Sequence, residues 1–150
     1  MALEEVERAV SGLTKEQLWL APGGAASCGF HLMHLAGSTD RLFTYARGEG
    51  LSDTQRAALA AERTPDPRPT LDALLAGWRA AVDRGLRQLA GTDHVTLLDP
   101  RLVGKAQLPS TALGLLFHAA EHAQRHAGQI VTTAKVVRGL AQDRRTSTTV

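Results

Sequence analysis

Cysteine and aromatic residues are scarce in this sequence, and long apolar runs are missing from it. The one cysteine, Cys28, excludes an intrachain disulfide and fits a reducing compartment. No run approaches the roughly 18 apolar residues of a membrane-spanning helix. The N-terminal stretch MALEEVERAV is acidic, unlike a secretory signal. We therefore expect a cytoplasmic protein that does not enter the membrane.

An excess of charge of one sign is also missing. The 150 residues include 17 basic and 15 acidic side chains, which leaves a net charge of +2. A protein dedicated to binding nucleic acid usually carries a denser basic patch. We therefore expect no nucleic-acid partner.

Aliphatic side chains make up most of the apolar content. Hydrophobic residues account for 43% of the chain, but there are only three Phe, two Trp and one Tyr. Leu and Ala favour helices, and the alternation of Val, Ile, Thr and aromatics that marks strands is scarce. A chain of this length is enough for one domain with its own core. The sequence thus predicts an all-α fold in a single domain.

Capping residues, glycines and apolar periodicity divide the chain into helices. We expect a four-helix bundle with long second and last helices and one longer crossover connection. In the helix opened by Thr70, the predicted bundle-facing stripe is Leu71, Leu75, Trp78, Val82 and Leu89. The domain is predicted to span residues 1–140, with 141–150 as a frayed tail. The expected helices lie at residues 2–11, 14–20, 27–47, 52–63, 70–90 and 111–138, the last one ending at Gly139.

Histidines are the most informative residues. His118, His122 and His126 repeat at intervals of four in the last predicted helix. Four residues turn a helix by about 40°, so the three lie in one stripe, with His126 pointing most inward and His118 near the edge. Two histidines at this spacing can bind one Zn²⁺ or Ni²⁺ ion. The helix predicted at residues 27–47 contains His31 and His34, either of which could be the third ligand. The spacing alone leaves a metal site and a set of packing histidines both open.

Two stretches carry a resemblance to a known family. LFHAAEHAQRHAGQI at residues 116–130 resembles the EHxxRHxGQ hallmark of the DinB/YfiT-like metalloenzyme superfamily. GFHLMHLAGS at residues 29–38 resembles the first metal motif of that family. The resemblance extends over about residues 3–139. It implies a four-helix bundle that holds one divalent metal ion, Zn²⁺ or Ni²⁺, through three histidines, which fall on His34, His122 and His126.

The resemblance also implies a function. Members of the superfamily include bacterial thiol transferases and isomerases that use low-molecular-weight thiols. We therefore expect a metal-dependent enzyme acting on a small molecule, either a small-thiol-dependent transferase or a hydrolase, and we assign no catalytic residue. The alternative is a non-catalytic helical protein, either a monomer or a homodimer, whose histidines or metal are structural. An open coordination position would indicate the enzyme, and a fourth protein ligand the structural site.

His31, His118 and Gln129 are further candidates for the pocket or for contacts with the metal ligands. His118 either orients a substrate or is a half-exposed histidine. Gln129 either donates a hydrogen bond to a ligand imidazole or fills a packing gap. Gly128 is expected to let another helix approach closely.

Two other reactive side chains, Glu121 and Cys28, are expected to be structural rather than catalytic. Glu121 precedes Arg125 by four residues and is expected to form a surface ion pair with it rather than to act as a base. Cys28 lies near a predicted helix N-terminus, where a thiol pKa can fall. A lone cysteine is more often a small buried apolar residue, and we expect that here.

Overall fold

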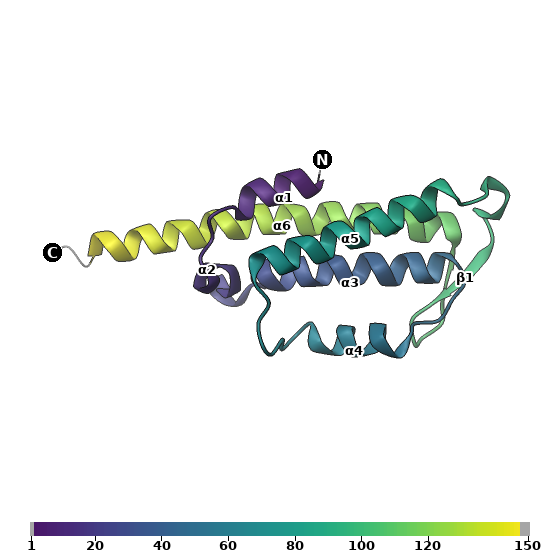
Figure 1. Cartoon of the computed structure of the whole chain (residues 1–150), viewed down its shortest axis with the longest axis horizontal. Coiled ribbons are helices and arrows are strands. Elements are labelled where there is room, and N and C mark those ends of the chain that lie inside the picture. Colours follow the sequence, from purple (N-terminus) through teal and green to yellow (C-terminus); the bar gives the residue numbers. More distant parts are fainter. Residues whose placement is uncertain (1, 148–150) are drawn as a thin grey trace.

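The fold is a helical bundle with one small hairpin (Figure 1). The structure, a computed structural model, describes the backbone of residues 2–147 and the side chains of residues 2–143. The helices are α1 (Ala2–Val10), α2 (Lys15–Trp19), α3 (Cys28–Ala46), α4 (Asp53–Ala61), α5 (Leu71–Ala90) and α6 (Ala112–Ser147). The strands are β1 (Pro100–Val103) and β2 (Leu108–Thr111), and short 3₁₀ turns lie at Pro22–Gly24 and His94–Thr96.

Four helices form the bundle, as predicted. α3 packs against both α5 and α6, and α1 packs against α6. Figure 1 shows that α3 and α5 run in the same direction, while α1 and α6 run in the opposite direction. Two successive parallel helices need a connection that returns along the bundle. That connection is the predicted crossover, and it contains α4.

Side-chain caps explain where the helices begin. Thr14 and Ser52 both form capping boxes, and Ser27 and Thr70 accept hydrogen bonds from the backbone N–H three residues later. Each cap satisfies an N–H group that has no partner within its helix. These four starts were predicted from the sequence and are confirmed.

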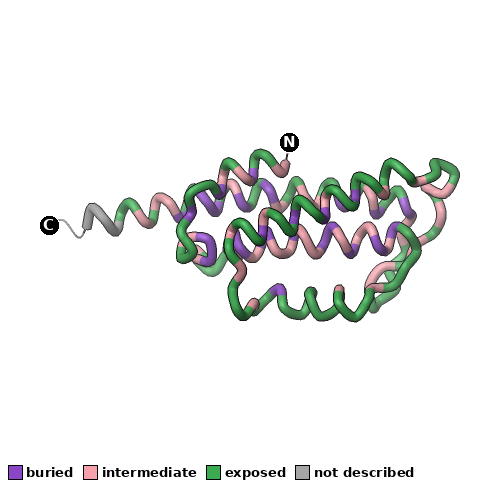
Figure 2. Tube along the Cα trace, viewed as in Figure 1, coloured by how far each residue is buried: buried purple, intermediate pink, exposed green. Residues whose placement is uncertain are grey.

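The core lies between the four bundle helices, where Figure 2 shows their buried residues facing one another. Close approach depends on small residues at two places: a Cβ at Gly29 would lie 2.7 Å from the Trp19 ring, and one at Gly85 would lie 2.9 Å from Phe43. Trp78 is the largest of the fully buried side chains. The core includes Val6, Val10, Leu18, Leu32, Leu35, Leu74, Trp78, Ile130 and Val137.

The predicted stripe on α5 is partly wrong. Trp78 is buried, but Leu89 is 47% exposed. Leu71, Leu75 and Val82 are partly buried and pack against the core as predicted. The same side of α5 also buries Leu74, Ala81 and Gly85. The prediction followed the large apolar residues, whereas the tight contact between α5 and α3 requires small ones.

The hairpin was not predicted. β1 and β2 pair antiparallel, with Pro100 opposite Thr111 and Leu102 opposite Pro109. A proline in each strand argues against a strand in sequence, because it removes a ladder donor. The hairpin touches the end of α3 through Arg101, whose Nε donates to the carbonyl oxygen of Ala46 at 2.8 Å.

The predicted end of the last helix is also wrong. α6 continues through Gly139 to Ser147, so residues 141–147 of the expected tail are helical, and 148–150 lie outside the described residues. Gly139 lacks the positive φ of a helix-ending glycine, unlike Gly48 (φ 80°). Among the described helices, none combines the length and the apolar character that crossing a bilayer requires.

Candidate metal centre

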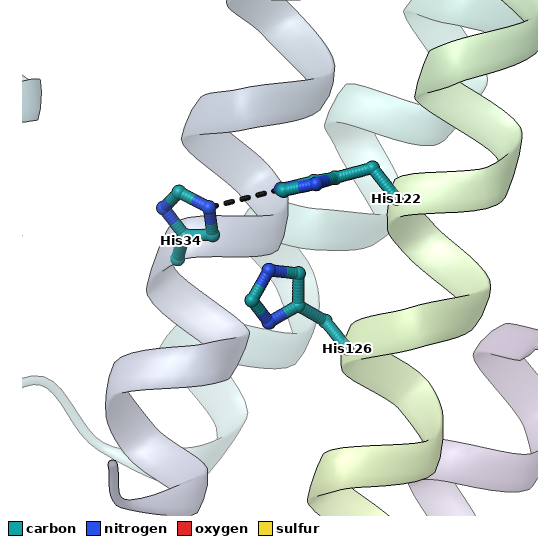
Figure 3. A group of neighbouring side chains, drawn as sticks. All are labelled: His34, His122 and His126. Atoms are coloured by element: carbon teal, nitrogen blue, oxygen red, sulfur yellow. Dashed lines mark hydrogen bonds between the residues drawn. The ribbon is translucent and has the colours of Figure 1, made fainter.

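Three histidines from two helices meet between α3 and α6. His34 comes from α3, and His122 and His126 come from successive turns of α6 (Figure 3). Each offers a ring nitrogen, and the three nitrogens lie within 4.8 Å of one another. These are the three histidines that the sequence singled out, and the structure brings them together.

Core packing on both sides of each histidine sets its position. On α3, the neighbouring Leu32 and Leu35 are fully buried, which turns the intervening His34 toward the edge of the core. On α6, Ala127 and Ile130 are buried. The apolar residues of both helices therefore leave one shared face for the imidazoles.

The shortest contact in the cluster joins His34 and His122. Their Nε2 atoms lie 2.9 Å apart. Two nitrogens bound tetrahedrally to one zinc ion at roughly 2.1 Å lie about 3.3 Å from each other. The His126 ring centroid lies 4.4 Å from that of His122 and 4.8 Å from that of His34. The spacing suits three ligands of one cation.

Glu62, the residue that ends α4, fixes the orientation of His34. Its Oε2 lies 2.8 Å from His34 Nδ1, and its Oε1 accepts from Arg41 Nη1 at 2.5 Å. Burial by itself would raise the pKa of Glu62, but the hydrogen bonds from His34 and Arg41 hold that pKa below its usual range. An ionised carboxylate only accepts, so His34 Nδ1 carries the hydrogen. In neutral His34 the lone pair is then on Nε2, which faces His122.

His31 holds His126 in a similar way. Their Nδ1 atoms lie 2.9 Å apart, although the residues are 95 positions apart in sequence. His31 is only 6% exposed, and burial lowers its pKa, with a smaller contribution from the neighbouring His34. The described residues thus provide contacts that orient two of the three histidines.

Burial also keeps His122 and His126 neutral. Loss of solvent lowers the pKa of each to about 4, and the neighbouring histidines add to the effect. Neutral imidazole is the form that binds metals. At neutral pH both rings therefore have a nitrogen lone pair.

The residues present fit a divalent metal ion. Three imidazoles suit Zn²⁺ or Ni²⁺. In addition, Nδ1 of His122 is buried and has no hydrogen-bond partner within the part of the chain that the structure describes. An unpaired buried nitrogen is costly in a purely structural cluster. The side chain of His34 is 22% exposed, so solvent-borne ligands reach the cluster.

The remaining candidates on α6 lie toward solvent. His118 is 44% exposed, and its Nδ1 is 3.4 Å from Glu121, which also pairs with Arg125 at 3.7 Å as expected. Gln129 is exposed, and in residues 2–143 no hydrogen bond joins it to a ligand imidazole. The prediction for Gly128 is wrong, because a Cβ there would meet nothing within 4 Å. It faces a groove, not a neighbouring helix.

Cys28 is a buried structural residue. It is fully buried in the core, where its Sγ lies 3.7 Å from the carbonyl oxygen of Ile130. Burial raises the pKa of its thiol to about 11. The thiol is therefore protonated at neutral pH, in agreement with the apolar assignment.

Two pockets lie near the cluster, although none of the three histidines lines either of them. One, of about 520 Å³, lies between the loop before α3 and the segment after α4, and Phe30 and Glu62 are among its lining residues. The Phe30 ring stacks on His34 with centroids 5.7 Å apart. The other, of about 710 Å³, is lined by His31, Arg125 and Gln129. Small molecules thus have space on two sides of the histidines.

Sequence reasoning missed Glu62 and Arg41. Arg41 lies seven residues after His34, which places both on one face of α3, and this spacing was a usable signal. Glu62 stands at the end of a short exposed helix, and nothing in the surrounding sequence ties it to His34. Its position depends on how the crossover connection folds back.

The fold and the cluster define a class: a four-helix bundle with a three-histidine group able to hold a metal ion. Comparison with known families agrees with this class. The model of the DinB superfamily matches residues 1–130, so the chain belongs to the DinB superfamily. The matched range contains all three histidines. No curated protein matches the chain.

Proposed function

We propose that the protein is a metal-dependent enzyme that binds one divalent ion, Zn²⁺ or Ni²⁺, through His34, His122 and His126. The observation that carries the proposal is the convergence of three ring nitrogens from α3 and α6 within 4.8 Å. The low pKa values of His122 and His126 support it, because protons do not compete for these nitrogens at neutral pH.

The chain's own residues would divide the work. His34, His122 and His126 would bind the ion, while Glu62 and His31 would hold two of the rings in place. Bound there, the ion would supply Lewis acidity that lowers the pKa of a water molecule or a thiol. The exposed edge of His34 gives such a molecule access.

The reaction that we propose is transfer of a small thiol or hydrolysis of a small molecule, in the cytoplasm. The nearby pockets of about 520 and 710 Å³ support a small-molecule substrate. Three protein ligands support a catalytic ion, since structural zinc sites are usually closed by four.

Metal analysis tests the proposal directly. Protein purified without chelator would be compared with the His122→Ala/His126→Ala double variant by elemental mass spectrometry. His94→Ala is a matched control, because the His94 side chain is 89% exposed in the turn before the hairpin. We expect about one metal ion per chain in wild type and control, and loss in the double variant.

Thermal unfolding provides the second readout. Zinc at a hundred times its dissociation constant should stabilise wild type by about 2.7 kcal/mol, because it binds the folded state. The double variant should gain nothing. Equal stabilisation of both proteins, or no uptake of zinc or nickel by wild type, would contradict the proposed site.

Replacement of the metal ion by Co²⁺ tests whether a small thiol binds to the ion. Addition of a small thiol to the Co²⁺ protein should produce a sulfur-to-cobalt charge-transfer band if the thiol reaches the ion. An unchanged spectrum in the presence of bound Co²⁺ would argue against thiol transfer.

A further inference from the structure

We propose that Glu62 is a positioning residue for the metal centre, and that it links metal binding to the docking of α4. The proposal rests on the proposed function, since it concerns how His34 is presented to the ion. It adds a residue outside the two histidine motifs, from a segment that contributes no ligand.

Glu62 is buried, and both of its carboxylate oxygens have a hydrogen-bond partner. The residue is only 4% exposed, although it ends a helix whose own residues include none that is buried. Each of its oxygens has one partner: His34 Nδ1 at 2.8 Å and Arg41 Nη1 at 2.5 Å. Arg41 is itself only 8% exposed. A buried carboxylate without a partner is costly, and Arg41 offsets that cost.

Gly37 provides the space for this contact. It lies on α3 between His34 and Arg41, and a Cβ there would overlap Glu62 Oε1 and would lie 2.6 Å from Arg41 Nη1. Any larger residue would therefore force the Glu62 carboxylate or the Arg41 guanidinium to move. Gly77, in the interior of α5, has nothing within 4 Å of its Cβ position and is a matched control.

Two polar contacts attach α4 to the bundle. Near its start, Gln55 Nε2 donates to Asp40 Oδ2 at 2.6 Å and to Thr44 Oγ1 at 2.8 Å. At its end the attachment is Glu62. A cation on Nε2 makes the His34 N–H a better donor, so it strengthens the bond to Glu62. By linkage, a docked Glu62 raises metal affinity to the same degree.

The linked segment also borders a pocket. Residues 62–66 and Arg68, together with Phe30 and the loop before α3, line the pocket of about 520 Å³, and Phe30 stacks on His34. Metal binding would thereby stabilise one wall of the space next to the ion.

Zinc affinity, measured by competition with a chromophoric chelator, tests the positioning. We expect Glu62→Gln to bind zinc more weakly, and Glu62→Ala to lose about 10–100-fold, the range for such hydrogen-bonded partners of a ligand. Gly37→Ala should also bind more weakly, while Gly77→Ala should stay within about threefold of wild type.

A double variant separates positioning from stability. Arg41→Met/Glu62→Leu leaves no unpaired buried charge, so it should fold with about the stability of wild type. We expect it to lose zinc affinity nevertheless. Wild-type affinity in this folded variant, or in Glu62→Ala, would overturn the positioning role.

Hydrogen exchange tests the linkage to α4. Zinc should slow amide exchange at the end of α4 and in residues 62–68 of wild type and of Gln55→Ala, but not of the double variant. Unchanged exchange in zinc-bound wild type would overturn the linkage. If wild type binds no zinc, the proposed function fails together with this inference. If wild type binds zinc, and the Glu62 variants bind it with the same affinity, the proposed function stands and this inference alone fails.

Discussion

α4 and α5 both pack against α3, but by opposite means. α5 presents Leu74, Trp78 and Ala81 to the core, and all three are buried. α4 buries none of its own residues and is attached through Gln55 and Glu62. Apolar burial scales with area and is non-directional, whereas hydrogen bonds contribute little net energy but fix particular atoms.

The difference between α4 and α5 means that one helix stabilises the domain while the other orients a residue of the metal site. The face of α3 that meets α5 stabilises the domain, and the face that meets α4 orients His34. A segment that buries none of its own residues and is attached through polar contacts opens at low free-energy cost, which suits a wall beside a binding site. The two helices should therefore respond differently to equivalent substitutions.

Removal of the largest core side chain should lower the free energy of unfolding more than any other change considered below. We expect Trp78→Ala to lower the free energy of unfolding by about 3–5 kcal/mol, because it leaves a cavity between α5 and α3. Urea denaturation measures the change. Leu86→Ala, on the same helix but 58% exposed, is the control and should change little. A small effect of Trp78→Ala would break the contrast between the helices.

Matched cap substitutions should sharpen the contrast. Thr70 and Ser52 cap α5 and α4 in the same way, each accepting from the backbone N–H three residues on. We expect Thr70→Ala to lower the global free energy of unfolding by about 1 kcal/mol. Ser52→Ala should leave the global value almost unchanged and speed hydrogen exchange within α4. Equal global effects would mean that α4 unfolds only with the bundle.

The smallest expected change concerns Cys28, on the core-facing side of α3. Its buried thiol has a pKa raised to about 11, so at pH 7–8 it is protonated and out of reach. The thiolate would form only as the pH rises toward that value. We expect no alkylation by iodoacetamide in the native protein and complete reaction in urea, followed by mass spectrometry. Rapid native alkylation would show that this face of α3 opens.

Local signals predicted most of the helix starts. Thr14, Ser27, Ser52 and Thr70 cap the helices where the sequence indicated, because a cap depends on a few neighbouring residues. The end of α6 was predicted wrongly because Gly139 continues the helix, whereas Gly48 turns to positive φ just after α3. The hairpin escaped prediction because its pairing joins Pro100 to Thr111 across a loop.

Some features of the metal site could likewise be predicted from local sequence, and others could not. His122 and His126 are one helical turn apart, so their shared face follows from sequence spacing alone. Their meeting with His34 was expected from the family motif, and the structure brings the three together. Glu62, His31 and Gly37 acquire their positions from contacts between segments far apart in the chain.

The sequence by itself determined the helical class, the caps and the histidine stripe, because each depends on residues within a few turns of one another. Only the tertiary structure decided which side chains orient His34 and His126. The contacts between Glu62 and His34 and between His31 and His126 span 28 and 95 residues. They exist because the crossover connection returns to α3 and because α6 packs along it, and no local pattern encodes either event.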